Sequence, residues 1–111
     1  MIDKDGIRGI FATYQKYGWV LRRLCITPAL TRKFGEEYFN GFGVPVTTSE
    51  VDAAWFSRPP REGENSWEIR YLGDIPYALV IRIDEAGTEA ESQIAEAEQR
   101  LIATIKAKRE A

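Results

Sequence analysis

The segment 66–72 alternates between large apolar and charged residues, and this pattern constrains the fold more than any other part of the chain. Successive side chains of a strand point to opposite sides, so the apolar residues share one face and the charged residues share the other. The apolar set is Trp67, Ile69 and Tyr71, and the charged set is Glu68 and Arg70. Such a strand is buried on one side only.

A second segment of this kind, residues 77–83, follows the chain reversal expected at Gly73-Asp74. A two-residue loop there would pair Glu68 with Leu79 and bring charge into the apolar face. Shifting the pairing by one residue gathers the large apolar side chains on one face, and burial selects that register. We therefore predict an antiparallel hairpin with an odd-length loop, Gly73 to Ile75 or longer. The predicted pairs are Trp67 with Ile81, Ile69 with Leu79 and Tyr71 with Tyr77.

The N-terminal segment has the periodicity of an amphipathic helix. Its apolar residues recur at helical spacing over 7–17. Asp3 or Asp5 is placed to cap the start of this helix, and Gly18 is placed to reverse the chain after its end. Residues 19–27 are rich in β-forming side chains, so we expect a strand there, with a continued helix as the alternative. On that strand the adjacent arginines at 22 and 23 would point to opposite faces.

The segment 28–50 is harder to interpret. It is compatible with a short helix over 29–38 that Gly35 interrupts. Pro45 restricts the extended residues around it to a sheet edge or a connection. We expect the next strand over 54–58. Because the structure of 28–50 is open, the sequence allows three to five strands.

The C-terminal segment predicts a long helix with an apolar stripe from Ile94 to Ile105. Thr88 and Glu91 fit a capping box at its start. Together the elements predict an α+β fold. We expect a two-layer sandwich in which a mainly antiparallel sheet of three to five strands packs against the N-terminal and C-terminal helices, both on the face of Trp67.

Length and composition define the class of protein. The 111 residues suit a single domain over 1–111, and a hydrophobic fraction of 44% supplies its core. A net charge of −2 disfavours binding to nucleic acid. The chain has no histidine and one cysteine, so we expect no disulfide, no metal site and no cofactor. No signal peptide or membrane-length apolar stretch is visible, and we expect a cytoplasmic protein that does not bind membranes.

Two groups of residues are candidates for binding. Trp55 and Phe56 are adjacent, so on a strand they point to opposite faces. If only one face is covered, one of them lies exposed beside Arg58 and resembles an interface hot spot. The alternative is that loops or the N-terminal helix cover the second face. Arg70 and Arg82 project from the face opposite Trp67 and, with Arg58, could bind an anion through their guanidinium groups; the alternative is a solvated sheet face.

No catalytic, metal-binding or nucleotide-binding motif stands out in the sequence. Cys25 lies within an apolar run and is expected to be buried. We therefore predict a non-enzymatic protein-interaction or accessory domain, whose partner is another protein or a second copy in a homodimer. The alternative is a domain that binds a small anionic ligand, and an enzyme that uses carboxylates or Cys25 ranks last.

Overall fold

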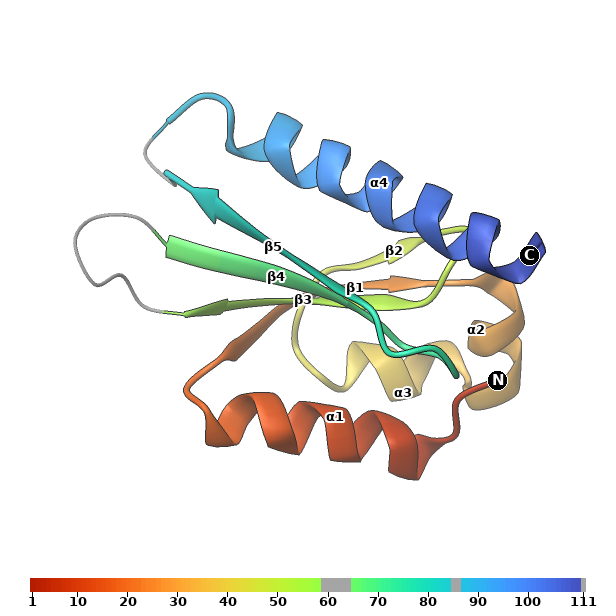
Figure 1. Cartoon of the computed structure of the whole chain (residues 1–111). Helices are drawn as coiled ribbons and strands as arrows, with labels where there is room; N and C mark the ends of the chain where they lie inside the picture. Colours follow the sequence, from red (N-terminus) through yellow and green to blue (C-terminus); the bar gives the residue numbers. More distant parts are fainter. Residues whose placement is uncertain (59–64, 85–86, 111) are drawn as a thin grey trace.

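The computed structural model describes residues 1–58, 65–84 and 87–110 (Figure 1). The elements in chain order are α1 (Lys4–Lys16), β1 (Val20–Ile26), α2 (Pro28–Phe34), α3 (Glu36–Asn40), β2 (Val46–Thr48), β3 (Ala53–Arg58), β4 (Asn65–Tyr71), β5 (Ala78–Ile83) and α4 (Ala90–Glu110). The five strands form one sheet in the order β2-β1-β3-β4-β5, in which only the β1–β2 pair is parallel. The α+β class, and the mainly antiparallel sheet packed against both terminal helices, are confirmed.

The β4–β5 hairpin has the predicted register. Trp67 pairs with Ile81 and Ile69 pairs with Leu79, while the Tyr71 N–H donates to the Tyr77 carbonyl at 2.9 Å. The three large apolar side chains of β4 are buried, and the residues between them are only partly buried. Burial of one face therefore sets the register, as the alternating pattern indicated.

The two terminal helices lie on opposite faces of the sheet and not on the same face (Figure 1). α4 packs on the side that carries Trp55 and Trp67, which we call the α4 face. α1 packs on the side that carries Phe56, which we call the α1 face. The reason lies in β3, where the residues from Ala53 to Ser57 are all buried. A strand that is apolar on both sides needs cover on both sides, so helices form a layer on each face.

Local signals at the ends of the helices act largely as predicted. The Asp3 side chain, not that of Asp5, accepts a hydrogen bond from the Gly6 N–H at 2.7 Å and caps α1. Gly18 has a φ of 85° where the chain leaves α1 for β1. Gly35, with a φ of 88°, separates α2 from α3. L-residues with a side chain rarely adopt such angles, so glycine is favoured at both breaks.

Residues 20–26 form a strand, but the two arginines in it do not point to opposite faces. The pairing of β1 with β3 shifts between Leu21 and Arg23, so Arg22 is the extra residue of a β-bulge. Both guanidinium groups lie over the Trp67 ring, 4.9 Å from its centroid for Arg22 and 6.0 Å for Arg23. The bulge thus places both arginines on the α4 face, because it changes the alternation of the strand.

Candidate functional site

Trp55 and Phe56 belong to the core on opposite faces of β3, with exposed fractions of 0% and 1%. The Trp55 ring makes an edge contact with Trp67, with 6.0 Å between the centroids. Phe56 stacks on Tyr14 of α1 with a centroid distance of 4.0 Å. The N-terminal helix therefore covers the second face, which is the alternative that the sequence left open. Neither aromatic side chain is available on the surface.

Arg58, Arg70 and Arg82 all lie on the α1 face of the sheet. In register, Ser66 of β4 lies between Arg58 of β3 and Arg82 of β5, and Arg70 lies further along β4. α1 covers this face over β3 but leaves it open over β5, where Val80 is 59% exposed. The structure thus places the three arginines around an open part of the sheet.

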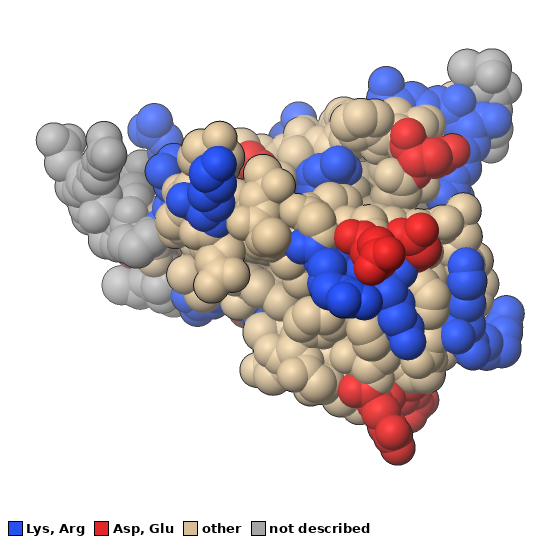
Figure 2. All heavy atoms as spheres, turned by 90° about the horizontal axis from the view of Figure 1, so that it is seen from below, with Lys and Arg blue, Asp and Glu red and all other residues tan. Residues whose placement is uncertain are grey.

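Arg58 and Arg70 contact a neighbouring side chain and the backbone, respectively. The Arg58 guanidinium lies 5.4 Å from the centroid of the Trp19 ring. Arg70 Nη1 donates to the carbonyl of Tyr71. On the α1 side of the molecule, Lys and Arg side chains form separate groups with Asp and Glu next to some of them, and no continuous basic band crosses this view (Figure 2).

Glu68 marks the border of the area that α1 covers. Its carboxylate accepts a hydrogen bond from the hydroxyl of Tyr14. Burial raises the pKa of Tyr14 well above its usual value, and the neighbouring Glu68 carboxylate raises it further. The Glu68 carboxylate is thus engaged with α1 and lies between the arginines of β3 and β4.

β5 is an edge strand, and within the described part of the chain no other strand pairs with its outer side. In an antiparallel ladder, alternate residues direct their backbone N–H and C=O groups toward the neighbouring strand. The Tyr77 carbonyl faces β4, since it accepts from the Tyr71 N–H. By alternation, the backbone groups of Ala78, Val80 and Arg82 point outward. They offer a row of hydrogen-bond donors and acceptors to another strand.

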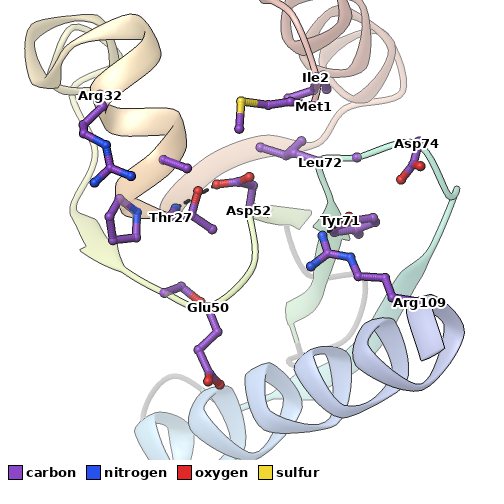
Figure 3. Close-up of a pocket in the computed structure, with 14 residues that line it drawn as sticks. Met1, Ile2, Thr27, Arg32, Glu50, Asp52, Tyr71, Leu72, Asp74 and Arg109 are labelled. Carbon is purple, nitrogen blue, oxygen red and sulfur yellow. Dashed lines mark hydrogen bonds between the residues drawn. The ribbon is translucent and has the colours of Figure 1, made fainter.

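A cleft of about 620 Å³ lies where α2, α4, the N-terminal segment and the β4–β5 turn meet (Figure 3). Its lining residues are Met1, Ile2, Thr27, Pro28, Ala29, Arg32, Ser49, Glu50, Asp52, Tyr71, Leu72, Gly73, Asp74 and Arg109. Figure 3 shows Arg32 and Arg109 on opposite walls, with Asp52 between them. Arg58, Arg70 and Arg82 are not in this lining.

Two short contacts fix the polar groups of this cleft. Arg109 Nη2 donates to the Tyr71 hydroxyl at 2.7 Å, and its guanidinium lies 5.8 Å from the Tyr71 ring centroid. Asp52 Oδ1 accepts from the Thr27 N–H at 2.7 Å, at the start of α2. The sequence did not indicate this site, because its residues come from separate segments and form no short motif.

A smaller cleft of about 240 Å³ lies between β2 and α3. Among the described residues, Glu36 is the one charged residue in its lining, which otherwise consists of apolar, threonine and asparagine side chains. This composition offers no group that would orient a charged ligand strongly. Arg58, Arg70 and Arg82 do not line this cleft either.

Cys25 is buried beneath α4, where its Sγ lies 3.6 Å from Glu98 Oε1. Burial, together with the neighbouring Glu98 carboxylate, raises the pKa of the Cys25 thiol to about 12. The thiolate is the nucleophilic form of cysteine. The thiol is therefore protonated near neutral pH and offers no activated nucleophile.

Residues 1–58, 65–84 and 87–110 offer neither a metal site nor a membrane-spanning helix. No group of three or more acidic or cysteine side chains in these residues could hold a metal ion. None of the helices there is both long enough and apolar enough to cross a bilayer. Comparison of the chain with models of protein families, with curated proteins and with solved structures finds no match.

Proposed function

We propose that this chain is a non-enzymatic interaction domain that pairs with a second copy of itself through the outer edge of β5. The observation that carries the proposal is the exposure of this edge. β5 is six residues long, contains no proline, and has Val80 on its surface with 59% of its area exposed. The opposite edge strand, β2, has only three residues. Short edge strands resist pairing with other chains, whereas longer and more apolar ones favour it.

The sequence of β5 suits antiparallel pairing with itself. With a two-fold axis at Val80, the outward backbone groups of the two strands meet, and Val80 lies opposite the same residue of the second copy. Ala78 then lies opposite Arg82, and Leu79 lies opposite Ile81. Apolar side chains meet across the axis, and no two arginines are placed opposite each other, which would oppose pairing.

The size of the contact sets the expected strength. Pairing along one short strand buries less than the roughly 1,600 Å² of a standard protein interface. Each new backbone hydrogen bond adds about 0.5–1.5 kcal/mol. We therefore expect a dimer that forms reversibly as the protein concentration rises, not an obligate one.

The other two functions that the sequence suggested have weaker support. Binding of a small anion by Arg58, Arg70 and Arg82 has less support from the described part of the chain, since none of the three arginines lines either of the two clefts described above. An enzyme based on Cys25 would need a reactive thiolate, and the raised pKa of this thiol opposes that.

Light scattering on a sizing column over a range of protein concentrations tests the proposal. The informative variant is Val80→Lys, with Val20→Lys as the matched control, because Val20 is 53% exposed on β1 and lies away from the β5 edge. We expect the wild type and Val20→Lys to shift toward the dimer mass and Val80→Lys to stay monomeric. A wild-type monomer at every concentration, or a Val80→Lys dimer as stable as the wild type, would overturn the proposal.

A further inference from the structure

We infer that the cleft between α2 and α4 binds a small zwitterionic ligand, a molecule with one carboxylate and one amino group such as a free amino acid. This inference is independent of pairing through β5. It rests on two guanidinium groups on opposite walls, Arg32 and Arg109, and on the carboxylate of Asp52 between them (Figure 3).

The two arginines are the groups on the walls of the cleft that can bind a carboxylate. Arg109 is held in place by the buried Tyr71, whose hydroxyl accepts from Nη2 at 2.7 Å. A guanidinium carries five N–H donors, so this contact leaves donors for a ligand. Arg32 forms no ion pair within the described residues. Guanidinium groups bind carboxylates through two parallel hydrogen bonds, which suits a carboxylate placed between these walls.

Asp52 supplies the opposite charge. Its Oδ1 accepts from the Thr27 N–H at 2.7 Å, which orients the carboxylate. An ionised carboxylate accepts about four hydrogen bonds, so its second oxygen can accept from an ammonium group. Because the backbone of Thr27 holds Asp52, the acceptor is positioned before a ligand arrives.

The balance of charges favours a ligand that carries both signs. Glu50 is paired with Lys106, with 2.9 Å between Oε1 and Nζ, so its charge is largely compensated. A ligand with only negative groups would meet the carboxylates of Asp52 and Asp74, and one with only positive groups would meet the arginines. A zwitterion satisfies both sets, and the mixed lining rejects the other two classes.

The rest of the cleft suits a small organic molecule. Its volume of about 620 Å³ lies within the range of roughly 300–1,000 Å³ that is typical of ligand sites. Ile2, Pro28 and Leu72 contribute apolar surface to the lining. An aliphatic or small aromatic side chain of an amino acid could pack there.

The test is a titration of the whole isotopically labelled chain, followed by amide chemical shifts. The probes are the standard amino acids. The comparison ligands are succinate, which carries only negative groups, and an aliphatic diamine, which carries only positive groups. We expect at least one amino acid to give saturable shifts around Thr27 and Tyr71. The ligands of one sign should bind at least about tenfold more weakly, a difference of about 1.4 kcal/mol.

Variants separate specific binding from general effects on the fold. Arg32→Gln and Asp52→Asn should each weaken amino-acid binding about tenfold or more, since each removes one charge-assisted contact. Arg32 is exposed on α2, so its replacement leaves the fold intact. Arg58→Gln, outside the cleft, is the control and should bind as the wild type does. Absence of saturable shifts with every amino acid, equal binding of succinate, or unchanged binding by Arg32→Gln would overturn the inference.

Discussion

The indole Nε1–H of Trp55 on β3 donates to the Glu98 carboxylate of α4 with a distance of 2.9 Å. The same oxygen of Glu98 lies 3.6 Å from Cys25 Sγ on β1. One carboxylate on the helix therefore satisfies polar atoms from two strands of the sheet. Trp55 is fully buried, so water cannot replace Glu98 as the acceptor for its N–H if Glu98 is lost.

Replacing Glu98 should reveal this contact in the stability of the domain. Glu98→Ala leaves the buried Trp55 N–H without its acceptor, and we expect the free energy of unfolding to fall by about 1–3 kcal/mol. Glu98→Gln retains an acceptor oxygen and should lose less. Urea unfolding followed by tryptophan fluorescence measures both. Equal losses for the two variants would show that the hydrogen bond does not matter.

Tyr14 links α1 to β4 through its hydrogen bond to Glu68 and to β3 through its stacking on Phe56. Tyr14→Phe keeps the ring and removes the hydroxyl. We expect a loss of about 1 kcal/mol in the free energy of unfolding. A double-mutant cycle with Glu68→Ala, which removes the acceptor, isolates the pair, and fully additive losses would contradict the contact.

The thiol of Cys25 should be unreactive in the folded protein and should make stability depend on alkaline pH. Its pKa is raised from 9.0 to about 12 by burial. Above about pH 9 the unfolded chain loses this proton first, so the folded state becomes less stable as the pH rises toward 12. Cys25→Ala should reduce this decline relative to the wild type.

Iodoacetamide should label the unfolded chain far faster than the folded one at about pH 8. Fast labelling of the folded protein would restore the cysteine-based enzyme as a candidate.

Gly73 supports the position of Tyr71 beside the cleft. A Cβ at this residue would overlap the Tyr71 ring, which Arg109 also holds. Gly73→Ala should therefore lower the free energy of unfolding by about 1–3 kcal/mol through overpacking. The control is Gly9→Ala in α1, where a Cβ meets no atom within 4 Å. That change should raise stability by up to about 1 kcal/mol, because alanine favours the helix. Thermal unfolding distinguishes the two, and a gain in stability for Gly73→Ala would contradict the packing described.

Features set by local pattern were predictable from the sequence. The register of the hairpin follows from the alternation around Ile69, and the reversal after α1 follows from Gly18. The prediction that α1 packs on the same face as α4 was wrong, although the apolar residues on both sides of β3 indicate a strand that is covered on both faces. The bulge at Arg22 depends on pairing with β3, so no local pattern marks it. At the start of α4, Glu91 binds Arg23 through both carboxylate oxygens, a contact between distant segments.

For the candidate sites, too, the sequence predicts what depends on local pattern but not what depends on contacts between distant segments. Adjacent aromatic residues on a strand were correctly placed on opposite faces, but their exposure depended on where α1 packs. The cleft brings together Arg32, Asp52 and Arg109, which are far apart in the sequence. Only the folded chain places them around one volume, so spacing alone could not reveal the site.

Amide hydrogen exchange, measured for each residue of β5, tests self-association through this edge most directly. If two copies pair there, the amides of Ala78, Val80 and Arg82 become hydrogen-bonded across the interface. We predict that their exchange slows as the protein concentration rises, while the amides of Leu79 and Ile81, which face β4, are protected at every concentration. Fast exchange at 78, 80 and 82 that is independent of concentration would contradict pairing through β5.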